Sequence, residues 1–344
     1  MLMTCQAGFE SLLARELKEL HLHSVVEQGP GWVRVDGGNV TSPGALALTR
    51  VAFAHLTVLA PSEVRGDSVN ALASRVAEFY LAAIRNERIE SAWPNVWLGP
   101  PEMVGLGRRI SGVEAAFGEI LKRKLSRVAK LAVADLPRGT SAAPVRGLFV
   151  HFVDFGRAFV SREAFVHGPR RMADDELAPS RSYLKVEEAY VVLGREPAAG
   201  ETVCDLGAAP GGWSYSAAKR GARVIAVDNG PLKGGALNHP AIEHRREDAF
   251  AFRPEEHSRF DWLFCDLVED PHHVLKNIVS PWLERGWCRY FVVNLKFGRV
   301  DPIALLDELR AGGSPFVARA TRVRVQHLYH DREEITIVGE TGGS

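Results

Sequence analysis

The sequence predicts an α/β protein whose C-terminal half forms a doubly wound, mostly parallel sheet closed by an antiparallel hairpin. Apolar strand-like segments alternate with helix-like segments after residue 200. The first of these strands ends in a glycine-rich turn that opens a helix, and the last two β-rich runs are joined by a polar turn. The N-terminal half mixes helices and strands in the order of a smaller α+β module.

The elements of the C-terminal half are short and separated by polar or glycine-containing breaks. Their strands are continuously apolar, which is typical of strands buried on both faces of a sheet. Strands are predicted at residues 202–206, 223–228, 261–267 and 289–296, helices at 212–220, 273–284 and 302–310, and the hairpin at 321–330 and 334–338.

The N-terminal half opens with an amphipathic helix over residues 7–21, where apolar residues recur at helical spacing. Strands follow at 33–36 and 52–60, then a helix at 69–84, a loop rich in Trp, Pro and Gly at 93–101, a basic helix at 112–132 and a strand pair within 147–161. The polar stretch 167–179 is predicted to link this half to a C-terminal domain over residues 180–344.

The overall composition is that of a soluble globular protein. Lys plus Arg and Asp plus Glu number 42 each, so the net charge of zero does not argue for or against a nucleic-acid partner. No apolar run is long enough for a membrane span, and the first ten residues lack a secretory pattern. The four scattered cysteines have neither CxxC nor Cys/His ligand spacing. These features predict reduced thiols, a cytoplasmic location and no metal site.

Basic residues gather in one part of the N-terminal half. Between residues 108 and 138 there are eight basic side chains against three acidic ones, which indicates a contact surface for nucleic-acid phosphates. A solvated helix face is the alternative interpretation. The candidates for this contact are Arg108, Arg109, Lys122, Arg123 and Lys124, together with Arg170 and Arg171, whose alternative role is to cap the linker.

The segment VCDLGAAPGGW carries the most specific motif of the chain. A strand delivers Asp205, and the chain then turns through Gly207, Gly211 and Gly212, where the missing Cβ lets backbone pass close to a ligand. The alternative is a dinucleotide-binding turn, which has the spacing GxGxxG and places a pyrophosphate at the helix N-terminus. Here the spacing is GxxPGG, and Pro210 removes a backbone donor. The pattern favours S-adenosylmethionine, a cofactor without phosphate.

Two more acids follow at the ends of the next segments. Asp228 ends the second strand, where an acid accepts hydrogen bonds from ribose hydroxyls. Asp248 ends a short segment further on, where we expect it to meet an adenine amino group. With Asp205, these acids predict a nucleoside pocket at the carboxyl edge of the sheet.

Four polar residues stand at the ends of buried elements. Lys185 opens a helix, Asp266 and Lys296 end strands, and Glu334 begins the last strand, with Glu333 as its alternative. Lysines that end strands are usually snorkelling surface residues. At the carboxyl edge of a parallel sheet, however, strand ends line the ligand site.

This set resembles the Lys-Asp-Lys-Glu tetrad of the FtsJ-like ribose 2′-O-methyltransferases. The runs PSRSYLKVEEAY, DLGAAPGGWSY, NLK and LYHDREE resemble, more narrowly, the large-subunit ribosomal RNA 2′-O-ribose methyltransferase M family, and CQAGFESLLARELKEL resembles its opening segment. The resemblance implies a Rossmann-like class I methyltransferase domain preceded by a ferredoxin-like segment at 1–60 and a THUMP-like RNA-binding region at 61–166. It also implies a cytidine of large-subunit ribosomal RNA as the target. A monomer is the default expectation.

The resemblance also assigns roles to single residues. Lys296 would be the proton acceptor for the ribose hydroxyl, which requires a neutral amine, so we expect burial and the nearby Lys185 to depress the pKa of Lys296. Asp266 and Glu334 would orient the two lysines and limit how far this pKa falls, and no metal is required. The cofactor would contact Ser182, Ala209, Pro210, Gly211, Gly212, Asp228, Asp248 and Asp266.

Two other classes of function stay open on the sequence. One is a non-catalytic RNA-binding or ribosome-assembly factor on a methyltransferase scaffold. A scaffold without catalytic activity, however, would not require two lysines and two acids at strand ends. The other is a methyltransferase that acts on a small molecule, a protein, another RNA or a base. Against base methylation, CDLV stands where nitrogen methyltransferases carry an Asn/Asp-Pro-Pro-Tyr loop, and no cysteine follows a proline, as carbon-5 enzymes require.

Overall fold

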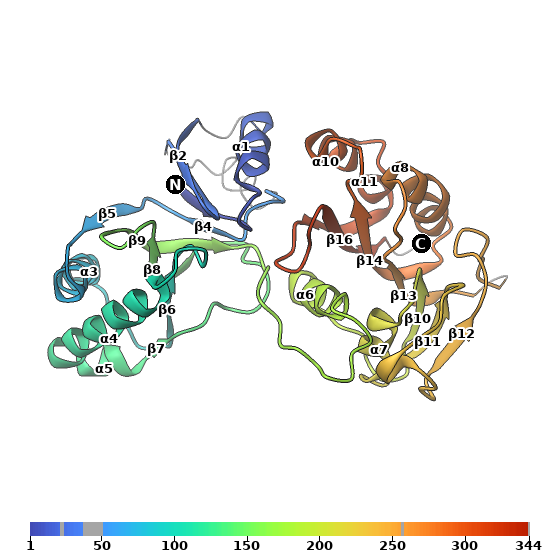
Figure 1. The fold of residues 1–344 in the computed structure, drawn as a ribbon, viewed down its shortest axis with the longest axis horizontal. Helices are drawn as coiled ribbons and strands as arrows, with labels where there is room; N and C mark the ends of the chain where they lie inside the picture. The colour runs from blue at the N-terminus through green and yellow to red at the C-terminus, as the bar shows by residue number, and fades with distance from the viewer. Residues whose placement is uncertain (21–23, 37–50, 256–257, 343–344) are drawn as a thin grey trace. The chain divides into compact units, whose positions relative to one another are not determined.

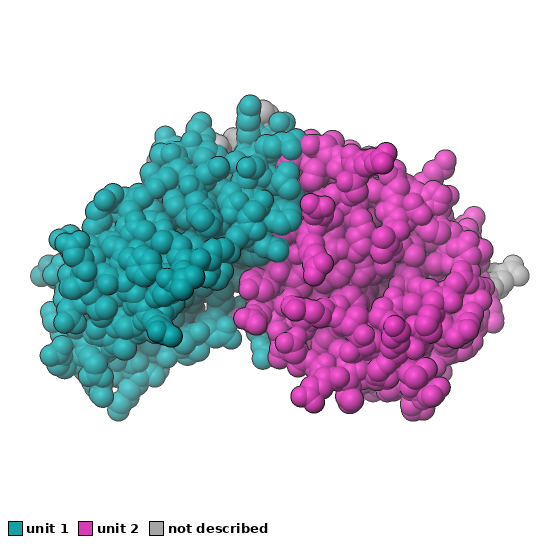
Figure 2. Space-filling model, in the orientation of Figure 1, with its two compact units in different colours: residues 1–167 teal, residues 168–344 magenta. Residues whose placement is uncertain are grey.

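The computed structural model describes residues 1–20, 24–36, 51–255 and 258–342. The chain forms two compact units, residues 1–167 and 168–344, coloured teal and magenta in Figure 2. Each unit contains its own sheet (Figure 1). No helix within the described ranges is long and apolar enough to cross a membrane.

The second unit is built on a sheet with the strand order β12-β11-β10-β13-β14-β16-β15. Its parallel strands are β12 (Ile242–Arg245), β11 (Arg223–Val227), β10 (Thr202–Leu206), β13 (Phe260–Cys265) and β14 (Cys288–Lys296). The antiparallel hairpin of β15 (Ala320–Gln326) and β16 (Glu334–Thr341) pairs with β14 through β16. The predicted fold class is therefore confirmed.

Helices cover both faces of this sheet because alternate residues of each strand bury on opposite sides. Tyr290 and Val292 of β14 belong to the core that includes α6 and α7, whereas the ring of Phe291 lies 5.5 Å from that of Phe316 in α11. The helices are α6 (Tyr183–Leu193), α7 (Gly212–Ala218), the short η1 (Gly234–Ala236), α8 (Pro271–Val274), the π-helical η2 (Leu275–Val279), α9 (Ser280–Glu284), α10 (Pro302–Arg310) and α11 (Pro315–Arg319).

Local sequence explains the boundaries that were predicted well. Asp301 caps α10 by accepting hydrogen bonds from the backbone of Ile303 and Ala304, and Pro302 occupies the first turn. The predicted helix 273–284 is present as the continuous run of α8, η2 and α9.

The first unit is an α+β structure with the strand order β2-β3-β1-β4-β9-β8-β6-β7, and β5 pairs with β9. Its elements are β1 (Leu2–Thr4), α1 (Glu10–Glu19), β2 (Val25–Gly29), β3 (Trp32–Val35), β4 (Leu56–Val58), β5 (Ser62–Arg65), α3 (Val69–Ala83), β6 (Trp93–Leu98), α4 (Leu106–Lys124), α5 (Ser126–Lys130), β7 (Ala132–Val133), β8 (Val145–Phe152) and β9 (Arg157–Val166). Helices α3 and α4 share one apolar core with the sheet.

Several predictions for this unit are wrong. The expected loop at 93–101 contains β6, which pairs in parallel with β8, because Trp93 and Trp97 pack their rings against the core residues Tyr80 and Phe117. The basic helix starts earlier than predicted, after Gly105, and breaks at Leu125 into α4 and α5. The strand expected at 52–60 is reduced to β4. Strands β1, β2, β5 and β7 were not predicted, nor was β12 in the second unit, and the end of the predicted helix 7–21 lies outside the described residues.

Candidate active site

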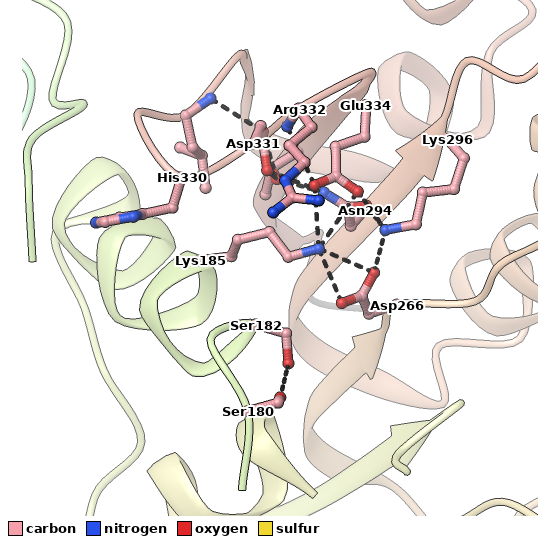
Figure 3. A network of polar contacts seen from close by, with 12 residues as sticks. Ser180, Ser182, Lys185, Asp266, Asn294, Lys296, His330, Asp331, Arg332 and Glu334 are labelled. Carbon is pink, nitrogen blue, oxygen red and sulfur yellow. Dashed lines mark hydrogen bonds and ion pairs between the residues drawn. The ribbon is translucent and has the colours of Figure 1, made fainter. Parts of the chain in front are cut away.

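The topology of the second unit brings four distant residues to one edge of the sheet (Figure 3). Asp266 directly follows β13, and Lys296 is the last residue of the neighbouring parallel strand β14. Strand β16 runs in the opposite direction, so its first residue, Glu334, is the register partner of Lys296. Lys185 reaches the same place from the first turn of α6.

These four side chains form a closed network of ion pairs. The Lys185 ammonium lies 3.0 Å from Asp266 Oδ2 and 3.2 Å from Glu334 Oε1. The Lys296 ammonium lies 2.6 Å from Asp266 Oδ1 and also donates to Glu334. Lys185 and Glu334 are 6% and 7% exposed, so these charges interact with little screening by water. Each carboxylate thus bridges both lysines. Glu333, the alternative to Glu334, is exposed.

The network shifts the ionisation of its members. Burial raises the pKa of Asp266, but the attraction of Lys185 and Lys296 outweighs it and holds this pKa below its ordinary value. Burial lowers the pKa of Lys296, but Asp266 and Glu334 outweigh it and hold this pKa above its ordinary value. The expectation that burial and Lys185 depress the pKa of Lys296 is therefore wrong for the protein on its own. The two carboxylates keep Lys296 protonated.

A second layer of buried polar groups fixes Lys296. The Lys296 ammonium donates to Asn294 Oδ1 at 2.7 Å, and Asn294 is fully buried two residues earlier on β14. Asn294 Nδ2 in turn donates to Asp331 Oδ1 at 3.1 Å and to the Thr336 hydroxyl at 3.0 Å. Burial, followed by repulsion from Glu334, raises the pKa of Asp331 to about 7. Sequence reasoning missed Asn294, although the period-two alternation of a strand places it on the same face as Lys296.

A further buried acid, Glu188, ties this region together. Its carboxylate accepts hydrogen bonds from the backbone N–H groups of Arg170 at 2.9 Å, Tyr329 at 2.7 Å and His330 at 3.1 Å. Desolvation raises the pKa of Glu188 to about 8. Glu188 thereby anchors the turn that leads into Glu334 to helix α6. Only its place within the run VEEAY signalled it in the sequence.

The glycine-rich loop lies between β10 and α7 at the same edge. Gly207 and Gly211 have φ angles of +80° and +106°, which favour glycine. A Cβ on Gly211 would lie 2.5 Å from the Cβ of Ala236, and one on Gly212 would lie 2.9 Å from Ser182 Oγ. The Asp228 carboxylate accepts from the backbone of Ala209 at 3.0 Å and Gly230 at 2.7 Å. This acid therefore holds the loop against the end of β11.

The other cofactor candidates differ in their surroundings. Asp205 is 1% exposed, accepts a hydrogen bond of 2.6 Å from Ser214, and has a pKa raised by burial to about 7. The Asp205 carboxylate thus links the end of β10 to the first residues of α7. Asp248 is exposed three residues after β12, and its side chain accepts from the backbone of Phe250. Ser182 lies beside the loop, where its carbonyl accepts from the indole of Trp213 at 2.9 Å.

The basic candidates fall in both units. Arg108, Lys122, Arg123 and Lys124 are exposed on α4, and Arg109 on the same helix donates to the carbonyl of Asp67. Arg170 and Arg171 belong to the second unit, where Arg171 is exposed. Within the described part of the chain, no group of three or more His, Cys, Asp or Glu side chains is placed to hold a metal ion.

An open α/β sheet with a glycine-rich first turn and this Lys-Asp-Lys-Glu network defines a methyltransferase of the FtsJ-like class. Accordingly, the FtsJ-like methyltransferase family matches residues 178–298, and the RlmL ferredoxin-like domain matches residues 1–52. The ribosomal RNA large subunit methyltransferase M of Halorhodospira halophila is 31% identical and aligns over 98% of this chain and 95% of its own. That of Alkalilimnicola ehrlichii is 34% identical over 98% and 93%. The chain belongs to the ribosomal RNA large subunit methyltransferase M family.

Solved structures are more distant. TrmN from Thermus thermophilus aligns with 99% of this chain and 98% of its own at 17% identity and a TM-score of 0.38. A likeness at this level supports no conclusion about function.

Proposed function

We propose that this chain transfers a methyl group from S-adenosylmethionine to the ribose 2′-hydroxyl of a cytidine in large-subunit ribosomal RNA. The observation that carries the proposal is the closed network of Lys185, Asp266, Lys296 and Glu334 beside the GxxPGG loop. The names of the related proteins point to ribosomal RNA as the polymer.

The glycine-rich edge fits the proposed cofactor. At Gly207, Gly211 and Gly212 an added Cβ would collide with neighbouring atoms. The absence of side chains there exposes the loop backbone to a ligand. Each Asp228 oxygen accepts one backbone hydrogen bond and keeps a further lone pair for a ribose hydroxyl. Exposed Asp248 is available to an adenine amino group. When bound, S-adenosylmethionine would supply an electrophilic methyl group on a sulfonium cation.

Lys296 is the proposed proton acceptor. As an ammonium it donates to Asp266, Asn294 and Glu334, which occupies all three of its N–H bonds. As a neutral amine it keeps two of these contacts and has a lone pair for the proton of the 2′-hydroxyl. The ribose oxygen would form its bond to the methyl carbon as the sulfur–carbon bond of the cofactor breaks and S-adenosylhomocysteine leaves as a neutral thioether. The hydroxyl proton would pass to Nζ, and the two carboxylates would stabilise the ammonium that results.

Lys296 must lose a proton before it can act, because Asp266 and Glu334 hold its pKa above the ordinary value. A cation bound beside the network, such as the sulfonium of the cofactor, would counteract the effect of both carboxylates and lower the pKa of Lys296. The two carboxylates therefore have a double effect. They make the neutral amine scarcer in the free protein, and they favour the proton transfer once the amine is present.

In this proposal the N-terminal parts of the chain bind the RNA and present it to the methyltransferase domain. Residues 1–60 form a ferredoxin-like segment, 61–166 a THUMP-like RNA-binding region, 167–179 a linker and 180–344 the methyltransferase domain. Phosphates contact Arg108, Arg109, Lys122, Arg123, Lys124, Arg170 and Arg171. The protein acts as a cytoplasmic monomer and uses no metal.

The test is methyl transfer from radiolabelled S-adenosylmethionine to large-subunit ribosomal RNA. Lys296→Met should lower the rate roughly 10²- to 10⁴-fold, the usual contribution of a general base. Glu333→Gln, a matched control at an exposed neighbour of the network, should keep the wild-type rate. Label in an alkali-resistant dinucleotide that contains cytidine would place the methyl group on the ribose.

Three outcomes would contradict the proposal. Near-normal turnover by Lys296→Met would remove its proton-acceptor role. Label on a base would identify a different methyltransferase. RNA binding without methyl transfer by the wild-type protein would favour a non-catalytic assembly factor.

A further inference from the structure

The first unit contains a pocket lined by residues of α4, α5, β6 and β7, which we call the α4–α5 pocket. These four elements are labelled in Figure 1. Its volume is about 290 Å³, close to the lower limit of small-molecule pockets. Its floor is apolar, because the lining residues Phe117 and Leu121 are core residues of α4 that are 1% and 2% exposed. Ala129 and Ala132 add apolar walls. The pocket therefore suits one flat, largely apolar ring system.

Polar groups line the same pocket at separate points. Asn95 is oriented by the indole of Trp97, which donates to its Oδ1 at 2.8 Å and leaves the Nδ2 protons for other acceptors. Ser126 contributes a hydroxyl, and Lys122 and Lys130 contribute ammonium groups. A ligand with hydrogen-bond acceptors on its edge and negative charge at its ends would satisfy all of these groups.

The charge around the pocket is strongly positive. The stretch from Lys122 to Lys130 holds five cations, including Arg123, Lys124 and Arg127, and no acid. All five side chains are exposed. In the part of the chain that the structure describes, none of them forms an ion pair with a carboxylate. Cations in the last turn of a helix also stabilise its dipole, which accounts for three of them. The same dipole effect applies to Arg127 and Lys130 in the last turn of α5, but it does not account for the pocket beside these cations.

We propose that the α4–α5 pocket binds one unstacked base of single-stranded RNA, with the flanking phosphates on Lys122 and Lys130. The inference rests on the proposed function, since it assumes that the substrate is RNA, and it adds a specific seat for one nucleotide. Unpaired bases bind proteins by burying a ring face on apolar or aromatic side chains while basic residues follow the backbone. An apolar peptide would fill the floor but would leave five cations without partners.

A glycine on α4 allows the pocket to be filled without changing its charge. Gly118 lines the pocket, and a Cβ at this position meets no atom within 4 Å, so Gly118→Leu should fold and occupy the space. Gly107 is a matched control on the same helix, because its Cβ also meets no atom within 4 Å and it does not line the pocket. The double variant Lys122→Gln/Lys130→Gln removes the charges and keeps the apolar floor.

The experiment measures binding of a fluorescein-labelled single-stranded RNA of mixed sequence, and of the same RNA annealed to its complement, to the full chain at several salt concentrations. Gly118→Leu should weaken binding of the single strand roughly tenfold, leave duplex binding unchanged and keep the slope of log K against log salt. Gly107→Leu should bind like the wild type. The lysine variant should make that slope shallower by about 1.4, the equivalent of two phosphate contacts.

If Gly118→Leu has a wild-type melting temperature and binds the single strand with unchanged affinity, the proposed role of the pocket is wrong. Equal losses for single strand and duplex, or equal losses in Gly107→Leu, would overturn it as well. These results leave the proposed function intact as long as the wild type methylates RNA and Lys296→Met does not. If the wild type binds neither form of RNA, the proposed function fails and the pocket inference fails with it.

Discussion

At the scale of single residues, Asn294 holds Lys296 in place without adding charge. Its amide cannot rotate freely, because Nδ2 is committed to Asp331 and Thr336 and therefore Oδ1 faces the lysine. A neutral acceptor orients the ammonium and raises its pKa less than a third carboxylate would. The protein thus balances precise placement of Lys296 against the need to deprotonate it.

Asn294→Asp should disturb this balance while keeping the size of the side chain. The new carboxylate would raise the pKa of Lys296 further, so the rate should fall at neutral pH and recover as the pH rises. Since Lys296 acts as a neutral amine, the wild-type kcat should also increase with pH, and the variant's profile should be displaced to higher pH. Each pH unit of displacement corresponds to about a tenfold loss at a fixed pH below the pKa.

The measurement is kcat between pH 6 and 10 with saturating cofactor and RNA. Asn277→Asp, which changes an amide on η2 outside the network, should give the wild-type profile. A profile of Asn294→Asp that coincides with the wild type would show that Asn294 does not influence the ionisation of Lys296.

At the scale of secondary-structure elements, the strand-turn-helix unit β10-loop-α7 depends on glycine for two separate reasons. Gly211 needs a left-handed φ angle, and it also packs against Ala236 with no room for a Cβ. Gly194, which ends α6, has a φ angle of +74°, and a Cβ added there would meet no atom within 4 Å. Both glycines have a left-handed φ angle, but only at Gly211 would an added Cβ collide with a neighbouring residue.

Replacing each glycine by alanine should separate the two effects. Gly194→Ala should cost about 1 kcal/mol of stability, the usual strain of alanine at a left-handed position, and should leave cofactor affinity unchanged. Gly211→Ala should cost about 1–3 kcal/mol more, because a collision of 2.5 Å forces the loop or η1 to move. It should also weaken binding of S-adenosylmethionine. Chemical denaturation and calorimetric titration measure the two quantities, and equal effects of both substitutions would contradict the argument.

At the scale of the whole molecule, buried histidines and buried carboxyl groups make stability depend on pH in opposite directions. Burial holds the pKa values of His151 and His327 near 4, so through these histidines the unfolded chain binds more protons, and their contribution to stability falls as the pH decreases from about 6.5 towards 4. Burial raises the pKa values of Asp205 and Asp331 to about 7 and of Glu188 to about 8. Through these acids the folded chain binds more protons between about pH 4 and pH 8, so their contribution to stability falls throughout this range, and below pH 6.5 the three acids outweigh the two histidines.

Melting temperatures of the full chain should therefore fall between pH 6.5 and 8, where the histidines are neutral in both states and only the acids contribute. Glu188→Gln should reduce this fall, because the amide cannot ionise, and His151→Phe should leave it unchanged, because His151 is neutral in both states above pH 6.5. A melting temperature that rises steadily from pH 6 to 9 would contradict the prediction.

Much of the second unit could be predicted because its signals are local. Continuous apolar runs indicated four of the parallel strands, and Asp301 with Pro302 marked the start of α10. The glycine-rich loop was recognisable because its chemistry lies within eleven consecutive residues. In the first unit the signals conflict with the tertiary structure. The composition of β6 favours a loop, but its tryptophans bury in the core, and this burial outweighs local preference.

The sequence by itself determined the class of fold, the position of the glycine-rich turn and three of the polar residues that meet at the sheet edge, Lys185, Asp266 and Lys296. Tertiary structure alone decided that Glu334 rather than Glu333 joins the lysines, that Asp205 is buried against Ser214, and that Asn294 touches Lys296. It also decided the charge on Lys296. The physical reason is that strand and turn formation depend on neighbours along the chain, whereas a pKa depends on burial and on charges that only folding brings within hydrogen-bond distance.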